Sequence, residues 1–393
     1  MLEFIAHGLL PLPWWGYLAI AAVTIHLTVI GVTLYYHRDQ AHRALDLHPV
    51  LRQFFRFWVW LTTAMVCSQW VAIHRKHHAF VETEDDPHSP QILGLRYFLG
   101  HGPEVYASAY KEQPDIVDKY GRGTPDDRFE RFCLRMPRVG VTVLAIVEIV
   151  LFGAPGLAIW AAQMLAMPLL ASALVNGLGH HSGYRNFEVP DASSNVLSFG
   201  LIAGGEELHN NHHAFPSSAR FSIRWFEFDV GWMYIRALAA VGLARVRRVY
   251  PRPKYSSPAR IDVEALRAVV TNRMHVMRAY RREVLLPILR EELANRSRGK
   301  YFRRNRRLLM RDARLLDEEA LTRRQRLIAR FPQLSVAWRY RESLRSIWEE
   351  RGHSNDRVVE RLREWVANAE QSELTGLARF ATRLRTYRLR QTA

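Results

Sequence analysis

Two short stretches of this sequence each carry three histidines at positions i, i+3 and i+4. These histidines are His74, His77 and His78 in the first stretch, and His209, His212 and His213 in the second. In a helix such positions share one face, so each stretch predicts three imidazoles on one side. Imidazole is a favoured ligand of borderline transition metals, and three of them form most of a coordination sphere. Because histidine accounts for only 17 of 393 residues, two such triplets are improbable by chance.

Three further histidines extend this candidate metal site: His37, His42 and His180. Nine histidines exceed the four ligands of a structural zinc site, and together with water they suit two metal ions. Soluble di-iron bundles use two Glu-x-x-His motifs, whereas this sequence has only one, Glu206 to His209. The residues therefore predict an imidazole-rich dinuclear site with open positions, which suits iron that binds and activates O₂.

The remaining histidines of the first 250 residues are not expected to bind metal. A neutral His26 bonded inside a helix bundle and a turn at His48 before proline explain two of them. The other four are predicted to be non-ligands: His7, His88, His101 and His181.

Two apolar segments predict membrane-crossing helices. Residues 14–36 form an uncharged run of 23 residues, long enough to cross a bilayer core of about 30 Å. No Lys or Arg precedes Arg38, so the positive-inside rule places the N-terminus outside and His37 at the cytoplasmic face. Residues 139–179 are interrupted at 153–156, which predicts two spans and a tight turn that return Asn176 and His180 to the cytoplasm.

A third apolar segment, residues 57–73, leads directly into His74. If it crossed the membrane once, His37 and His74 would lie on opposite faces and could not share a metal site. We therefore expect this segment to lie along the interface or to re-enter, since 17 residues is short for a span. Residues 226–244 are predicted to form an interfacial amphipathic helix. The expected fold is all-α, with membrane helical hairpins, a cytoplasmic histidine-rich cap and a basic helical extension.

Charge divides the chain into two parts. Residues 1–250 contain 21 Lys and Arg against 21 Asp and Glu, whereas residues 251–393 contain 34 against 17. We predict a membrane-embedded domain at 1–250, a proline-rich linker at 251–258 and an Arg-rich helical cytoplasmic extension at 259–393. Two cysteines cannot hold an iron–sulfur cluster and imply no disulfide framework.

The motifs HRDQAH at 37–42, HRKHH at 74–78 and HNNHH at 209–213 resemble the three histidine boxes of the integral-membrane fatty acid desaturases. Neighbouring text such as DDPHSP and GEELHNNHHAFPSSARFS resembles the acyl-CoA, stearoyl-CoA Δ9-type branch and its bacterial acyl-lipid relatives. The resemblance implies that the nine histidines ligate two non-heme irons, and that Asn176 holds one iron through water. It also implies O₂-dependent formation of a cis double bond at Δ9, the position typical of that branch. The substrate would be an acyl-CoA or a phospholipid acyl chain, and the location a bacterial inner membrane.

Several alternatives remain open from sequence. A hydroxylase or other oxygenase could use the same centre, and a non-catalytic membrane metal-binding protein is a more remote possibility. The chain has no G-x-G-x-x-G fingerprint for a flavin or nicotinamide, so we expect a separate electron donor such as a ferredoxin with its reductase. For the basic extension, the sequence favours anionic lipid headgroups, then an acidic donor or acyl carrier, with nucleic acid unlikely.

Overall fold

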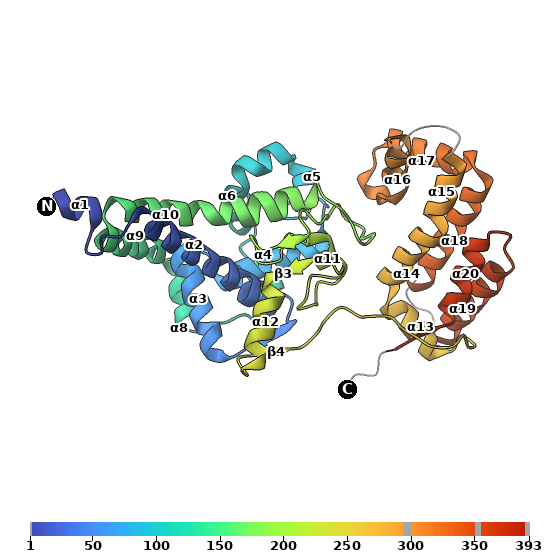
Figure 1. The fold of residues 1–393 in the computed structure, drawn as a ribbon, viewed down its shortest axis with the longest axis horizontal. Helices are drawn as coiled ribbons and strands as arrows, with labels where there is room; N and C mark the ends of the chain where they lie inside the picture. The colour runs from blue at the N-terminus through green and yellow to red at the C-terminus, as the bar shows by residue number, and fades with distance from the viewer. Residues whose placement is uncertain (1, 294–299, 350–354, 390–393) are drawn as a thin grey trace. The chain divides into compact units, whose positions relative to one another are not determined.

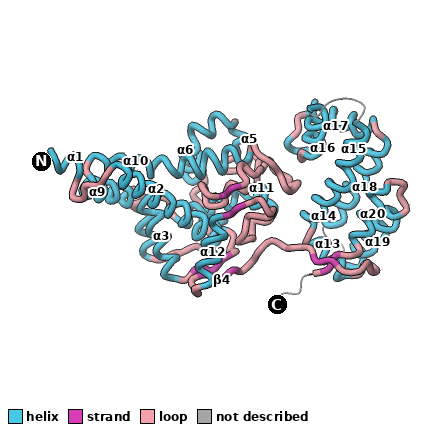
Figure 2. The backbone as a smooth tube through the Cα atoms, in the orientation of Figure 1, coloured by secondary structure: helices cyan, strands magenta, loops and turns pink. Residues whose placement is uncertain are grey.

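The computed structural model describes residues 2–293, 300–349 and 355–389, and these residues are mostly helical (Figures 1 and 2). They form two compact units. The first comprises Met1–Arg185 and Asp191–Tyr250, and the second comprises Asn186–Pro190 and Pro251–Ala393. The expected all-α fold needs one correction, because the described residues also form three two-stranded sheets.

Two long apolar helices run through the first unit. Helix α2 (Trp14–Gly31) continues into the π-helical segment η1 (Val32–Ala41). Helix α10 (Ala154–Met167) continues through η2 (Pro168–Gly177), which is also π-helical, into the 3₁₀ turn η3 (Leu178–His180). These composite helices have 28 and 27 residues and are long and apolar enough to cross a membrane. Such helices are typical of membrane association.

The second predicted hairpin differs from expectation in one arm. Helix α9 (Val139–Phe152) packs against α10 but has only 14 residues, fewer than the roughly 20 that a membrane-crossing helix needs. The turn is also tighter than predicted, because Gly153 alone separates the two helices. Gly153 has a φ of 63°, a conformation that glycine adopts readily. A Cβ added there would lie only 2.5 Å from the backbone oxygen of Ile5, so a larger residue would clash.

Residues 57–73 are divided between two helices, α3 (Pro49–Thr63) and α4 (Cys67–Phe80). Helix α3 ends at Thr63, and the next residue, Ala64, caps it in a left-handed conformation with φ 58°. The segment is therefore not a single straight helix. The chain changes direction immediately before α4, which carries the first histidine triplet.

Shorter elements complete the first unit. Its remaining helices are α1 (Leu2–His7), α5 (Pro90–Leu93), α6 (Leu95–Glu112), α7 (Ile116–Tyr120), α8 (Arg128–Arg135), α11 (His209–Ala214) and α12 (Val230–Ala240). Strand β1 (Leu45–Leu47) pairs antiparallel with β4 (Ala244–Val246), and β2 (Phe199–Gly200) pairs parallel with β3 (Phe228–Asp229). These pairings join segments that are far apart in the chain.

The predicted amphipathic helix at 226–244 is shorter in the structure, because α12 begins only after Asp229. The Asp229 carboxylate is buried, accepts a hydrogen bond from the backbone N–H of Trp232 at 2.9 Å, and thereby caps α12. It also pairs with the buried guanidinium of Arg38 at 3.0 Å. Asp229 therefore links α12 to η1, the segment that carries His37.

The second unit is a helical bundle with one small sheet. Its elements are β5 (Lys254–Tyr255), α13 (Val263–Thr271), α14 (Arg273–Tyr280), η4 (Arg281–Leu285), α15 (Leu286–Leu293), α16 (Lys300–Met310), η5 (Ala313–Leu315), α17 (Glu318–Arg330), α18 (Pro332–Glu349), α19 (Asn355–Glu370), α20 (Thr375–Leu384) and β6 (Tyr387–Arg388). Strand β5 lies within the predicted linker and pairs antiparallel with β6.

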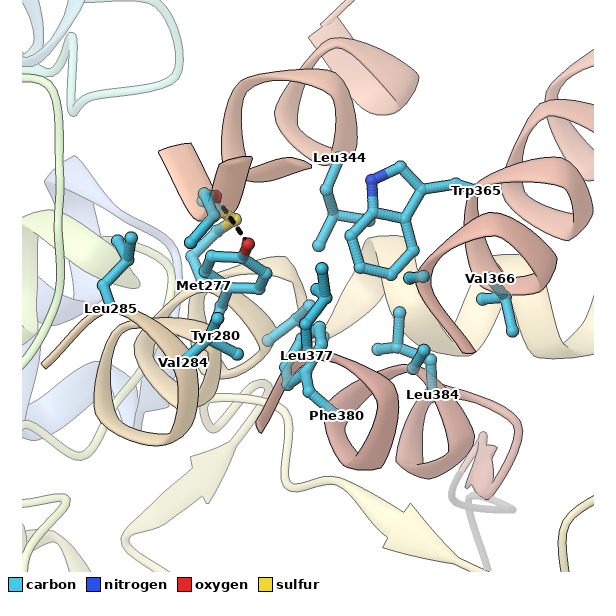
Figure 3. Packing of buried hydrophobic residues seen from close by; sticks show 14 of the residues in the cluster. Met277, Tyr280, Val284, Leu285, Leu344, Trp365, Val366, Leu377, Phe380 and Leu384 are labelled. Atoms are coloured by element: carbon cyan, nitrogen blue, oxygen red, sulfur yellow. Dashed lines mark hydrogen bonds between the residues drawn. The ribbon is translucent and has the colours of Figure 1, made fainter. Parts of the chain in front are cut away.

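The core of this unit is apolar (Figure 3). The Tyr280 ring packs edge-to-face against Phe380, and its hydroxyl donates to the Ala337 carbonyl at 2.6 Å. The segment Asn186–Pro190 belongs to this unit: Phe187 is buried, and Glu188 accepts a hydrogen bond from Arg341 at 2.7 Å. The extension thus has its own hydrophobic core.

Candidate metal centre

Five histidines from three parts of the chain converge in what we call the five-histidine cluster. They are His37 in η1 and His42 directly after it, His74 and His78 on α4, and His212 on α11. One nitrogen from each lies within 4.8 Å of the others. The Nε2 atoms face each other closely, at 2.8 Å between His42 and His74 and 2.9 Å between His78 and His212. This is the arrangement expected of imidazoles directed at one ion.

A second group, the four-histidine cluster, contains His77, His180, His209 and His213. The Nε2 atoms of His180 and His209 are 2.9 Å apart, and those of His209 and His213 are 3.2 Å apart. The clusters are adjacent, since the His78 ring stacks on His213 with 4.5 Å between ring centroids. All nine histidines predicted as ligands therefore lie in two neighbouring groups.

Each histidine triplet is shared between the two clusters. On α4, His74 and His78 face the five-histidine cluster, whereas His77 faces the four-histidine cluster. On α11 the division is reversed: His212 joins the five-histidine cluster, and His209 and His213 join the other. The sequence correctly predicted a common helix face, but the two helices are placed so that this face spans both sites.

The π-helical segment η1 brings His37 and His42 together. Five residues apart, these side chains would point in different directions on an α-helix. In η1 the backbone N–H of His42 donates to the carbonyl of His37, five residues back, at 3.0 Å. The two rings therefore lie 4.8 Å apart, between centroids.

Carboxylates accept hydrogen bonds from the outer nitrogens of four of the nine histidines. In the five-histidine cluster, His37 Nδ1–H donates to Glu206 at 2.7 Å. In the four-histidine cluster the donor–acceptor pairs are His77 with Asp86 at 2.9 Å, His180 with Glu82 at 3.1 Å and His213 with Asp191 at 3.1 Å. A proton held on Nδ1 leaves the Nε2 lone pair free for a metal.

Sequence reasoning did not assign these carboxylates, and the role of Glu206 beside its triplet was open. Asp86 lies nine residues after His77, so a search for acids just beyond a histidine triplet could have found it. Glu82 and Asp191 gave no such signal, because their partners are 98 and 22 residues away. Glu207 has a structural role: it accepts hydrogen bonds from the backbone N–H groups of Ile202, Ala203 and Gly205.

Electrostatics favour the neutral imidazole that a metal requires. Burial and neighbouring imidazoles lower the pKa of His42, His74, His78, His209 and His212 well below the ordinary histidine value. Burial likewise lowers the pKa of His213 to about 4, although Asp191 opposes this shift. Burial opposes ionisation of Asp86 and Asp191, but their histidine partners outweigh it and lower the pKa of both carboxyls.

The donor set fits metal ions. His212 Nε2 lies within 3.1 Å of the Nε2 atoms of both His37 and His78, and one nitrogen can donate only one proton. The buried Nε2 of His77 has no hydrogen-bond partner. Lone pairs crowded together in this way are satisfied by a shared cation, and all-nitrogen sets of this kind suit iron.

An apolar cavity adjoins both clusters. The cavity is lined by His37 and His74 of the five-histidine cluster and by His209 of the four-histidine cluster. Asn176 also lines it. Its other lining residues are mainly apolar: Val29, Val32, Trp70, Met167, Leu170, Ala171 and Val175. Asn176 therefore lines the same cavity as histidines of both clusters.

His88, expected to be a non-ligand, lies closer to the centre than anticipated. It is buried, its ring stacks on His77 at 4.2 Å between centroids, and it groups with His77 and Asp86. Neither of its nitrogens has a hydrogen-bond partner. By contrast, His181 is exposed and bonds to the hydroxyl of Ser182.

Comparison with known proteins identifies the first unit. Residues 12–250 match the fatty acid desaturase family. The chain belongs to the fatty acid desaturase family. It is therefore an oxidoreductase, its family acts on fatty acyl chains with O₂, and its buried histidine clusters agree with the metal site typical of that family. The resemblance carried by the three histidine motifs is confirmed.

Curated relatives of this desaturase differ in regiochemistry and acyl carrier. A Delta-9 acyl-lipid desaturase of Arabidopsis thaliana is 31% identical over 236 residues, covering 58% of this chain and 74% of the relative. An sn-1 stearoyl-lipid 9-desaturase of Synechocystis sp. is 31% identical, covering 58% and 71%. An acyl-CoA 5-desaturase of Anemone leveillei is 33% identical, covering 55% and 66%.

The helical extension has a separate similarity. Residues 265–392 match a transposase family. No pattern in the sequence predicted this. The matched segment begins within α13 and includes α14 to α20 of the second unit.

Proposed function

We propose that this desaturase introduces a cis double bond at the Δ9 position of a saturated fatty acyl chain, using two non-heme irons. The observation that carries the proposal is the apolar cavity lined by His37 and His74 of one cluster and His209 of the other. Adjacent methylenes of an acyl chain that reached this cavity would lie beside both groups of imidazoles. An apolar chain has no polar handle, so cavity shape would select the carbons.

Two irons held by the nine histidines would supply O₂ reduction and removal of two hydrogens from adjacent methylenes. The overall reaction converts CH₂–CH₂, O₂, two electrons and two protons into CH=CH and two waters. The protein's own contribution is to hold and orient. Glu206, Asp86, Glu82 and Asp191 keep the Nδ1 proton on their histidines, so that each Nε2 faces inward. Asn176 would hold one iron through water.

Burial of the site supports this role. His180 and His212 are fully inaccessible to solvent, and the adjoining cavity is lined mainly by apolar side chains. Exclusion of water protects a strong oxidant from side reactions. The irons, their ligands and the Asn176 water bridge are parts of the proposal, supported by the buried clusters and by family membership.

The position of the double bond and the acyl carrier are also part of the proposal. Two of the relatives above are named 9-desaturases of lipid-bound chains, which favours Δ9. The 5-desaturase is named for an acyl-CoA substrate, so both acyl-CoA and phospholipid acyl chains are candidates. Electrons would come from a separate ferredoxin-like protein with its reductase.

We further propose that the enzyme lies in a bacterial inner membrane, with its metal centre and extension on the cytoplasmic side. The two long apolar helices and the absence of Lys and Arg before Arg38 support this orientation. An organisation into a membrane domain at 1–250, a linker at 251–258 and an extension at 259–393 is likewise proposed from composition.

The test is lipid analysis by mass spectrometry in a host that expresses this chain. We expect monounsaturated chains two mass units lighter than their precursors, with the double bond at Δ9. His180→Ala and His212→Ala should abolish the product, whereas the exposed neighbour His181→Ala should retain it. Full activity of His212→Ala would refute the assignment of the clusters.

A product sixteen mass units heavier than its precursor would instead identify a hydroxylase using the same centre. A third result, metal binding without any change in lipid, would favour a non-catalytic membrane metal-binding protein. The sequence argues against that last alternative, because the apolar spans carry few charged residues.

A further inference from the structure

Five residues of the desaturase sequence pack within the helical extension. The segment Asn186–Pro190 lies inside the matched range 12–250, yet it belongs to the second compact unit together with Pro251–Ala393. We call it the anchor segment. It ends directly before Asp191, whose carboxylate accepts a hydrogen bond from His213 of the four-histidine cluster. The extension therefore holds a stretch of chain that leads straight into the metal centre.

Two apolar side chains fix the anchor segment. Phe187 is fully buried, and Val189 is buried as well. The Phe187 ring packs edge-to-face against His275 of α14, with 5.4 Å between ring centroids. The guanidinium carbon of Arg278, also on α14, lies 5.8 Å from the centre of the same ring. Aromatic contacts of this kind add to the stabilisation from burial, so the segment is packed into the unit.

Glu188 fixes the anchor segment by charge. Its carboxylate accepts a hydrogen bond from Arg341 of α18 at 2.7 Å, and Arg281 of η4 lies 3.7 Å from its other oxygen. The side chains of Glu188 and Arg341 are only 7% and 10% exposed, so water screens their attraction weakly. Buried charges need such partners, and the pair therefore holds the middle of the segment in one position.

Both ends of the anchor segment are held through backbone carbonyls. Arg281 donates a hydrogen bond to the carbonyl of Asn186 at 3.4 Å, and Arg314 of η5 donates to the carbonyl of Pro190. The segment is thus held at its start, middle and end by arginines from three elements of the second unit. Fixing five residues restricts the backbone freedom of the residue that follows them.

The two residues after the anchor segment support two histidines of the four-histidine cluster. Asp191 accepts a hydrogen bond from His213 at 3.1 Å. The backbone N–H of Ala192 donates to both carboxylate oxygens of Glu82, at 2.9 and 2.7 Å. Glu82 in turn accepts a hydrogen bond from His180 at 3.1 Å. Two of the three carboxylates behind this cluster therefore depend on where these two residues lie.

We propose that the helical extension positions Asp191 and Ala192 by holding the anchor segment, and so keeps His213 and His180 oriented for metal. Glu188 is then a positioning residue, since it acts on the cluster only through the chain that follows it. Partners behind a ligand fix the orientation of its ring, and they work only if they are themselves held.

The inference rests on the proposed function, because it takes the clusters as metal sites. It also predicts an effect confined to one of them. Glu206, the carboxylate behind the five-histidine cluster, accepts a hydrogen bond from Thr33 of η1 at 2.5 Å. The support of that cluster therefore comes from within the first unit.

Three variants of the full chain in nanodiscs test the proposal. Glu188→Gln removes the charge that Arg341 binds, and Phe187→Ala removes the buried ring. The control is Glu370→Gln, because Glu370 forms an equally short pair with Arg385, at 2.7 Å, elsewhere in the second unit. Circular dichroism of all three variants checks that the helices persist.

The first measurement is hydrogen exchange by mass spectrometry after a chelator has removed iron. The amides of Ala192 and Ser193 donate to Glu82 and Asp191, so their protection reports how firmly these groups are held. We expect their exchange to be at least about threefold faster in both anchor-segment variants than in the control, because local opening becomes easier. Exchange that is the same as in the parent, or raised equally in the control, would overturn the proposal.

The second measurement is a chelator titration of the iron-loaded protein. Loss of a partner behind a ligand weakens metal affinity by about 10-fold to 100-fold, so a loosened partner in Glu188→Gln should make one iron about threefold to tenfold easier to remove than in the control. In the double variant Glu188→Gln, Asp191→Asn the two losses should combine to less than their product, because they act through the same group.

Losses that multiply fully in the double variant would overturn the route through Asp191. A parent protein that retains no iron would refute the proposed metal centre instead. Because hydrogen exchange is measured without iron, it would still decide whether the extension holds Asp191 and Ala192. Failure of the proposed function and failure of this inference are therefore distinguishable.

Discussion

The two histidine clusters are built from the same residue type, yet they differ in what lies behind the imidazoles. The five-histidine cluster has one carboxylate partner, Glu206 on His37. Three of the four histidines in the other cluster donate to carboxylates, namely Asp86, Glu82 and Asp191. A carboxylate behind an imidazole raises the basicity of the ligand and adds negative charge near the metal.

This difference suggests compensation. The four-histidine cluster has one nitrogen fewer but more anionic support, and Asn176 lines the adjoining cavity. The five-histidine cluster would instead hold its metal through a larger number of imidazole ligands. We therefore expect the two metal positions to respond differently to the same type of substitution, and the following experiments measure that difference in order of expected effect.

The largest effect should come from removing one histidine of either cluster. His78→Ala in the five-histidine cluster and His213→Ala in the other should each reduce desaturation at least a hundredfold. Metal analysis of the purified protein should show a loss of about one iron in each case. If both variants lost both irons together, the clusters would be one cooperative site, and the comparison between them would fail.

A smaller effect is expected from substituting the carboxylates that accept hydrogen bonds from the histidines. Loss of such a partner typically weakens metal affinity by 10-fold to 100-fold. Asp191→Asn should therefore make one iron easier to remove in a chelator titration, and Glu206→Gln should do the same for the other iron. Asp46→Asn provides a control, because this acid pairs with Arg52, Arg245 and Arg247 instead of histidine. Equal chelator resistance of Asp191→Asn and the control would contradict an electronic role.

Acidification should destabilise the metal-free protein. Burial lowers the pKa of His213 to about 4, below the roughly 6.5 of an exposed imidazole. Below pH 6.5 the unfolded chain therefore binds more protons, and stability decreases as the pH falls toward 4. His213 alone accounts for a loss of about 3 kcal/mol over this range.

Thermal unfolding of chelator-treated protein between pH 7.5 and 5 measures this effect. His213→Gln should reduce the pH dependence, since other buried histidines still contribute to it, whereas the exposed His181→Gln should leave it unchanged. A profile that is identical for the parent and His213→Gln would show that His213 is not buried as a neutral group.

The smallest effect is expected at His88. It stacks on His77 of the four-histidine cluster, and Phe preserves such a stack. His88→Phe should retain both irons and change activity by no more than a few fold. Loss of an iron would instead make His88 a ligand and would give the two clusters five histidines each.

The sequence by itself was enough to identify the nine histidines, the two long apolar segments and the helical extension. The reason is that helical periodicity and hydrophobic patterning are local properties of the chain. The spacing of His74, His77 and His78 already placed them on one helix face. The histidine motif at 209–213 is also a local pattern, so the resemblance to the desaturase family could be recognised from sequence alone.

Tertiary structure decided how those residues are used. Only the meeting of the histidines of α4 and α11 divides each triplet between two clusters, and only the π-helical segment brings His37 beside His42. Glu82 pairs with His180 across 98 residues, a contact that no local pattern records. Such contacts depend on tertiary packing, since side chains from distant segments meet only when their helices pack at a particular rotation.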